Sequence, residues 1–226
     1  MMINEINSNT LSDAIVKLEN KSQYNIKLPF LITIKDVNKR DLNKEKYSFS
    51  NITDDFFDDN KLDNRWNSSK DWYLSYSRRL LRKIKNKNML DYAAKILIED
   101  KKTRRCVINT NIDQDIINGF CPALSLVQFK IVNNKLEMYT YWRSQEAFIA
   151  FPLNTLCMFS YQRKLLSKIN QKYKNIKLGK YTAFVNEMQY DDWCKYNDIE
   201  KEKKFKFYCS IIDYRGEVEY DKNYKR

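Results

Sequence analysis

Apolar residues recur along this chain with two different periods. A period near 3.6 residues predicts amphipathic helices, and alternation or a β-branched run predicts strands. Residues 36–68 are polar and weakly periodic, so we expect a long loop region there. Helices are expected at residues 10–21, 70–87, 89–100 and 151–172, and strands at residues 30–34, 105–109, 125–132, 135–142, 181–189 and 205–213.

The helix at 151–172 carries the most continuous apolar stripe, formed by Leu153, Leu156, Cys157, Tyr161, Leu165 and Ile169. We expect it to be the central helix of the molecule. Thr10 or Ser12 is the expected cap of the first helix. Together the elements predict a mixed α+β protein with one large sheet and helices on at least one face.

The composition indicates a packed globular protein. The chain has 226 residues, with 16 Tyr, 12 Phe and 4 Trp but only three Gly and three Pro. No repeat, linker or composition break divides the sequence, so we expect residues 1–226 to form a single domain.

The net charge of +12 favours a polyanionic or phosphorylated partner. The longest basic runs, residues 82–87 and 201–206, are typical of solvated faces or element ends. Nucleic acid is therefore an alternative partner that charge alone supports.

The reactive residue types narrow the chemistry. The chain has no histidine, which removes the usual base for a serine or cysteine nucleophile and every histidine-dependent metal site. Its five cysteines are odd in number and never spaced as C-x-x-C, so we expect no metal site, reduced thiols and a cytoplasmic location. No apolar run is long enough to predict a membrane span.

One segment carries a specific motif. Residues 121–154 read CPALSLVQFKIVNNKLEMYTYWRSQEAFIAFPLN, so two alternating strands run into a turn at Arg143-Ser144 and then a helix opened by Pro152 and Asn154. This order resembles the centre of thymidylate synthase and its relatives, the pyrimidine nucleotide hydroxymethylases. The resemblance covers residues 72–193 and implies a thymidylate synthase-like fold.

The resemblance implies a phosphate clamp. In the family an arginine of the Arg-Ser turn grips the nucleotide phosphate, which here matches Arg143 and Ser144. Two adjacent arginines from the partner subunit complete the clamp and match Arg104 and Arg105. Arginine suits this role because its planar fork donates two parallel hydrogen bonds to phosphate oxygens. Taken alone, Arg104 and Arg105 equally fit surface charges at a strand entrance.

The resemblance also implies contacts to the base and the sugar. Asn154 matches the asparagine that reads the pyrimidine edge, although asparagine is also a good helix cap. Gln128 matches the family's Gln-Phe strand, and is also explained as a satisfied polar side chain. Tyr190 matches the tyrosine of a His-x-Tyr pair that binds the sugar 3' hydroxyl, with Met188 in place of the histidine.

The catalytic position departs from the family. Ala123 occupies the position of the nucleophilic cysteine, and its methyl group cannot add to a pyrimidine ring. Cys121 is the candidate replacement, and a small buried hydrophobe is the alternative reading. Glu146 matches an acidic residue near the base and is a candidate catalytic acid or base. Residues 76–80, YSRRL, resemble the Tyr-Gly-x-Arg-Leu segment of shorter relatives and equally fit the surface of an amphipathic helix.

The resemblance therefore implies a transferase-type enzyme that binds a pyrimidine nucleoside monophosphate and modifies its base, working as a homodimer. It implies methylenetetrahydrofolate as the one-carbon donor, although residues 220–226 are basic and lack the family's apolar closing tail. The alternatives are a catalytically inactive homologue that senses nucleotides or acts as a regulatory subunit, and a basic nucleic-acid-binding protein.

Overall fold

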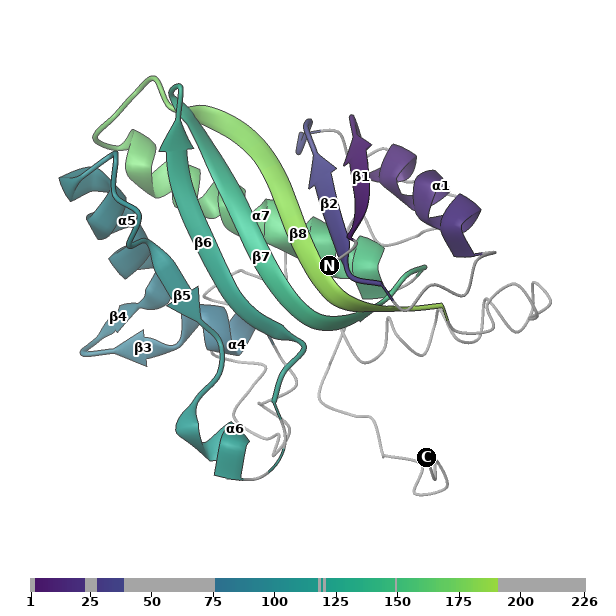
Figure 1. The fold of residues 1–226 in the computed structure, drawn as a ribbon. Coiled ribbons are helices and arrows are strands. Elements are labelled where there is room, and N and C mark those ends of the chain that lie inside the picture. The colour runs from purple at the N-terminus through teal and green to yellow at the C-terminus, as the bar shows by residue number, and fades with distance from the viewer. Residues whose placement is uncertain are drawn as a thin grey trace, which may run out of the picture.

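A six-stranded mixed sheet forms the centre of the molecule (Figure 1). The computed structural model describes residues 3–22, 28–38, 76–117, 119, 121–148 and 150–190. The sheet order is β1-β2-β8-β7-β6-β5, in which β1 pairs with β2 and β7 pairs with β8 in parallel and the other pairs are antiparallel. Its strands are β1 (Asn4–Ser8), β2 (Phe30–Ile34), β5 (Val107–Asn109), β6 (Leu124–Val132), β7 (Lys135–Glu146) and β8 (Lys177–Gln189).

Three helices lie on one side of this sheet. The long helix α7 (Ala150–Asn170) runs behind β6, β7 and β8 and contacts both α1 (Leu11–Ser22) and α5 (Met89–Glu99) (Figure 1). The core lies between helices and sheet, with Trp142, Tyr181 and Phe159 fully buried. No described helix covers the opposite face of the sheet. The expected α+β fold with one large mixed sheet and a long central helix is therefore confirmed.

The helix starts follow local capping chemistry. Thr10 caps α1, because its hydroxyl accepts the N–H of Asp13 at 3.2 Å. Asn88 and Asp91 form a reciprocal capping box at the start of α5. The strand predicted at 30–34 and the helix predicted at 89–100 agree with β2 and α5 to within a residue.

The helix predicted at 70–87 is wrong over its last residues. A short helix, α4 (Tyr76–Leu81), ends there and is followed by a hairpin of β3 (Lys83–Ile84) and β4 (Lys87–Asn88). Lys85 and Asn86 have φ values of 49° and 64°, as a two-residue hairpin turn requires. Residues 70–75 of that prediction lie outside the described residues.

Several other expectations change or go untested. The structure adds β1 and a short helix, α6 (Asp113–Ile117), and it extends β7 through Glu146. Arg143-Ser144 therefore lies in a strand and not in a turn, because residues 144–146 pair with residues 187–189 of β8. The loop predicted at 36–68, apart from residues 36–38, and the strand predicted at 205–213 lie outside the described residues.

Candidate functional site

The end of β7, the end of β8 and the start of α7 bring most of the candidate residues together. Ser144, Gln145 and Glu146 on β7 pair in register with Glu187, Met188 and Gln189 on β8. Asn154 on α7 and Tyr190 just after β8 belong to the same end of the sheet. The backbone of residues 121–123 leads into β6 next to Arg143.

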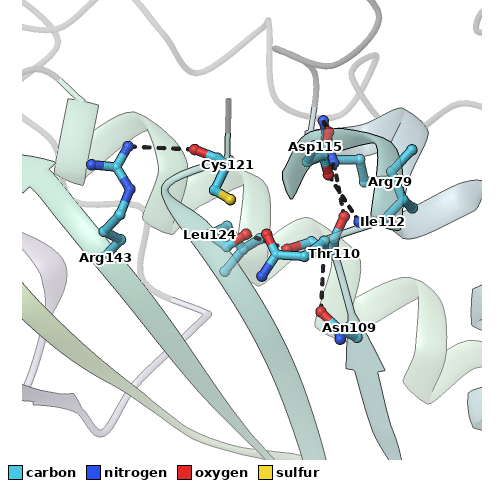
Figure 2. A network of polar contacts seen from close by, with 9 residues as sticks. Arg79, Asn109, Thr110, Ile112, Asp115, Cys121, Leu124 and Arg143 are labelled. Carbon is cyan, nitrogen blue, oxygen red and sulfur yellow. Dashed lines mark hydrogen bonds and ion pairs between the residues drawn. The ribbon is translucent and has the colours of Figure 1, made fainter. Parts of the chain in front are cut away.

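Arg143 is exposed and lies against the segment that leads into β6. Its backbone N–H donates to the carbonyl of Ala123 at 2.7 Å, and its Nη2 donates to the carbonyl of Cys121 at 3.4 Å. Figure 2 shows that the carbonyl oxygen of Cys121, rather than its sulfur, is turned toward the guanidinium. The other guanidinium N–H groups make no hydrogen bond to the described residues, so they are available to an anionic ligand.

Glu146 organises the turn between β7 and α7. It is buried, and its two carboxylate oxygens accept the backbone N–H groups of Phe148 at 2.8 Å and Ala150 at 3.0 Å. An acidic side chain in this position satisfies N–H groups that a helix start leaves open. The sequence predicts an acid–base role for Glu146, and the structure gives its carboxylate a capping role.

Asn154 is not the cap of α7, because it lies in the second turn of a helix that begins at Ala150. Its Nδ2 instead donates to Oε1 of the buried Gln145 at 2.9 Å. Pro152 stands in the first turn, where a missing N–H costs no hydrogen bond. The reading of Asn154 as a helix cap is therefore wrong, and its carboxamide belongs to a polar pair.

Tyr190 packs its ring between Phe148 and Phe30, with centroid separations of 5.9 and 6.2 Å. Its hydroxyl is buried and makes no hydrogen bond to the described residues. Burial raises the pKa of this hydroxyl, which keeps it protonated and able to donate at neutral pH. An unpartnered buried hydroxyl is uncommon enough to need an explanation.

Arg104, Arg105 and Gln128 form a separate group. Gln128 on β6 donates through Nε2 to the carbonyl of Arg104 at 2.9 Å, and both arginines are exposed. In the register of the sheet, Val107 of β5 pairs with Gln128 of β6, and Gln128 pairs with Tyr139 of β7. The three residues therefore lie at the same level along the strands. The chain turns just before β5, where the N–H of Val107 donates to the carbonyl of Arg105, so the group lies about four residues, or roughly 13 Å of strand, from the level of Arg143. Arg104 and Arg105 therefore lie at another level of the sheet than Arg143.

The thiols differ sharply in exposure. Cys121 is exposed, whereas Cys106 and Cys157 are buried. Burial raises the pKa of Cys106 and of Cys157 to about 12, so both stay as inert thiols. Among the described cysteines, Cys121 is the one that a substrate can reach.

Tyr76 and Arg79 belong to the YSRRL segment, whose sequence pattern also fits the surface of an amphipathic helix. The Tyr76 ring meets Trp142 edge to face at 5.4 Å. Burial raises the pKa of the Tyr76 hydroxyl, and hydrogen bonding from the backbone of Ala123 and Leu124 opposes that shift. The fully buried Arg79 donates to both oxygens of Asp115 at 2.5 and 2.9 Å, and to the carbonyl of Thr110 at 2.9 Å (Figure 2).

The described part of the chain offers no cluster of three or more acidic, cysteine or histidine side chains that could hold a metal ion. Within those same residues, no helix is long and apolar enough to cross a membrane.

Comparison with solved structures identifies the fold. The structure aligns with thermostable thymidylate synthase A from Bacillus subtilis at a TM-score of 0.53 and 16% sequence identity, over 77% of this chain and 70% of that chain. This likeness shows a thymidylate synthase fold.

Sequence similarity points the same way. The chain is 32% identical over 107 residues to a protein of Methanocaldococcus jannaschii whose curated name assigns it, provisionally, as a thymidylate synthase. The match covers 45% of this chain and 46% of that relative, so the chain spans about half the length of the curated relative. No protein-family model matches. In fold the chain is similar to thymidylate synthase A, and over this segment its sequence is similar to that of the Methanocaldococcus jannaschii protein.

Proposed function

We propose that this protein binds a pyrimidine nucleoside monophosphate at the end of β7. The observation that carries the proposal is the exposed Arg143, whose guanidinium has N–H groups to spare at the same end of the sheet as Ser144, Asn154 and Tyr190. Such a set suits a ligand with one charged phosphate and several neutral polar atoms.

Each residue has a distinct part in this proposal. Arg143 pairs with the phosphate, and the half-buried Ser144 beside it adds a hydroxyl. Asn154 reads the edge of the base, since a carboxamide offers both a donor and an acceptor. Tyr190 donates its buried hydroxyl to the sugar, in a place where that hydroxyl has no other described partner.

The phosphate clamp is proposed to be completed by a second copy of the chain. About four residues, or roughly 13 Å of strand, separate the level of Val107 from that of Arg143, which favours arginines from two copies of the chain at one phosphate. Arg104, Arg105 and Gln128 would then serve the site of the neighbouring copy. In that site the two arginines add positive charge, and Gln128 fixes the backbone that carries them.

The uncovered face of the sheet is the proposed dimer interface. A row of registered residues crosses it, running from Leu31 through Phe184 and Tyr141 to Leu126. Tyr141 and Phe184 are stacked at 5.3 Å, and Tyr141 and Leu126 are each 36% exposed. An apolar row of this kind on a face without a helix suits burial against an identical surface.

The proposed chemistry is limited by position 123. Ala123 cannot form a covalent bond to C6 of a pyrimidine, and the exposed Cys121 is the thiol that could replace the missing nucleophile. Among the described residues of this site, the buried polar atoms without a partner are Gln145 Nε2 and the Tyr190 hydroxyl. A pterin ring has several hydrogen-bond donors and acceptors, and these two groups cannot pair with all of them. We therefore derive no step through methylenetetrahydrofolate. The proposal therefore has two forms. In one, Cys121 takes part in a modification of the base; in the other, the protein binds the nucleotide without catalysing a reaction.

The test is a thermal-shift panel with dUMP, UMP, dCMP, CMP and inorganic phosphate, at low and high salt. A ligand at 100 times its dissociation constant adds about 2.7 kcal/mol of stability. We expect a shift with one pyrimidine nucleotide that survives high salt and is lost in Arg143→Ala. No shift with any nucleotide contradicts the proposal. Turnover of the responding nucleotide by the wild type, and its loss in Cys121→Ala, separates an enzyme from a sensor.

Single-stranded DNA belongs in the same panel, because the net charge of +12 supports nucleic acid as the alternative partner. Multiple phosphate contacts give binding that weakens steeply with salt, whereas one phosphate gives a shallow dependence. A response to DNA alone, lost at high salt, favours the nucleic-acid alternative.

A further inference from the structure

Gln145 is a buried polar residue whose hydrogen bonding is only half satisfied. Its side chain is 4% exposed. Oε1 accepts the Nδ2 hydrogen of Asn154 at 2.9 Å, but Nε2 has no partner among the described residues. A buried amide with two free donor hydrogens is unfavourable in the protein alone, so the group needs a role.

The position of Gln145 places this donor beside the other unpartnered group. Gln145 on β7 is the register partner of Met188 on β8, so the two side chains leave the sheet on the same side. Met188 carries no N–H, and Tyr190 follows two residues later with its own unpartnered hydroxyl. The ends of β7 and β8 therefore hold two buried donors whose hydrogen bonds are not made.

We infer that Gln145 is a ligand-binding and positioning residue of this site. Its Nε2 donates to a hydroxyl or carbonyl oxygen of the bound nucleotide, and its Oε1 holds the carboxamide of Asn154 in one orientation. With one Nδ2 hydrogen bonded to Gln145, the carboxamide of Asn154 is fixed so that its Oδ1 and its second Nδ2 hydrogen are offered to the ligand. This inference rests on the proposed nucleotide function and adds a specificity residue to it.

Gln162 provides an internal comparison. It is a fully buried glutamine on α7 whose Nε2 donates to the carbonyls of Leu136 at 2.6 Å and Gly179 at 3.3 Å. Only its oxygen lacks a partner, and an under-satisfied oxygen is less unusual than an orphaned N–H. Its donors stabilise the protein itself, whereas the donors of Gln145 have no partner in the part of the chain that the structure describes.

The experiment makes the same substitution at both glutamines. The melting temperature of Gln145→Met and of Gln162→Met is measured without ligand, and then with each of the four nucleotides and with inorganic phosphate. We expect Gln145→Met to melt close to the wild type but to bind the responding nucleotide about three- to tenfold more weakly, with its phosphate response unchanged. Gln162→Met should melt at a lower temperature and bind the nucleotide as the wild type does.

A second variant keeps the test informative if Gln145→Met does not fold. Gln145→Glu, assayed at pH 8, keeps the length of the side chain and the acceptor for Asn154 but removes the Nε2 donors. It is expected to weaken nucleotide binding as Gln145→Met does.

The outcomes separate this inference from the function on which it rests. If the wild type responds to a nucleotide and both Gln145 variants bind it equally well, the inference is overturned and the proposed function stands. If the wild type responds to no nucleotide, the proposed function fails and the inference falls with it.

Discussion

Arg79 and Asp115 show how single residues hold the approach to the candidate site. The ion pair is buried, and Arg79 also binds the carbonyl of Thr110. The Thr110 hydroxyl in turn donates to the carbonyl of Leu124, the first residue of β6 (Figure 2). Three polar links thus connect α4, α6 and the strand that follows Ala123.

Removing one partner of the Arg79–Asp115 ion pair should lower the stability of the protein. Arg79→Met leaves the Asp115 carboxylate buried without its cation, so we expect a loss of about 3–5 kcal/mol in the free energy of unfolding. Denaturation in urea measures this loss. The double variant Arg79→Met/Asp115→Leu should recover most of the stability, because neither charge is left unpaired. A double variant that is no more stable than Arg79→Met contradicts this account.

The same pair predicts a pH dependence. The Arg79 guanidinium, through its hydrogen bond, lowers the pKa of Asp115 below the value in the unfolded chain, which is about 3.9. A carboxyl whose pKa is lowered by folding adds stability above its unfolded pKa, and that stability is lost as the pH falls through the folded pKa. The stability advantage of the wild type over Asp115→Asn should therefore be full at pH 6 and shrink below about pH 4. An advantage that stays constant from pH 6 to pH 2.5 rules the mechanism out.

At the scale of elements, the pairing of β7 with β8 depends on a close approach at Gly179. The register shifts between Leu136 and Met138, and there the backbone of Gly179 meets β7 directly. A Cβ at position 179 would lie 2.8 Å from the carbonyl oxygen of Leu136 and 2.9 Å from Cγ of Glu137. Gln162 from α7 donates to both backbones at this point, so helix and sheet are joined where the pairing is irregular.

We expect Gly179→Ala to destabilise the protein by about 1–3 kcal/mol, because the added methyl group must displace a backbone carbonyl. Thermal or urea unfolding measures the effect. Lys177→Ala, at the exposed start of the same strand, is the control and should change the free energy of unfolding by less than about 0.5 kcal/mol. Equal stability of the two variants would show that the contact at Gly179 relaxes freely.

Element prediction from the sequence worked where packing and local pattern agree. Residues 30–34 include three β-branched side chains and alternate between buried and half-buried positions, and the 89–100 helix has both an apolar face and a capping box. The prediction failed at residues 83–87, where a short basic stretch is compatible with either a helix surface or a hairpin. Its turn at Lys85 and Asn86 depends on two positive φ angles that no hydrophobic period records. The family resemblance predicts a turn at Arg143-Ser144. The structure differs there because residues 144–146 pair with β8, which is distant in sequence.

The whole molecule is proposed to work as a dimer with sites shared between copies, and this can be tested by complementation. Arg143→Ala and Arg105→Ala should each bind the responding nucleotide weakly. When the two variants are refolded together, a mixed dimer has one site with both defects and one with none. We therefore expect the mixed dimers, as distinct from the two homodimers that form beside them, to regain tight binding at one of their two sites, measured by titration calorimetry.

Two observations would contradict the shared site. A mixture that binds only as the average of the two variants places both arginines in one chain's site, or places Arg105 outside it. Sedimentation showing a monomer at micromolar concentration removes the dimer altogether. In the dimer, Tyr141→Lys should favour the monomer, because it puts a charge in the apolar row.

Periodicity and short motifs in the amino-acid sequence are sufficient to predict the α+β class, the long central helix, most strands of the sheet and the resemblance of residues 121–154 to one family. These features depend on periodicity and on residues close together in the chain. The single domain over residues 1–226 stays a prediction, because residues 39–75 and 191–226 lie outside the described residues. Tertiary structure decided which candidates share a site. It separated Arg104, Arg105 and Gln128 from Arg143, gave the Glu146 carboxylate to the start of α7, and placed Gln145 opposite Met188. Strand register and burial fix those relations, and both arise from contacts between residues far apart in sequence.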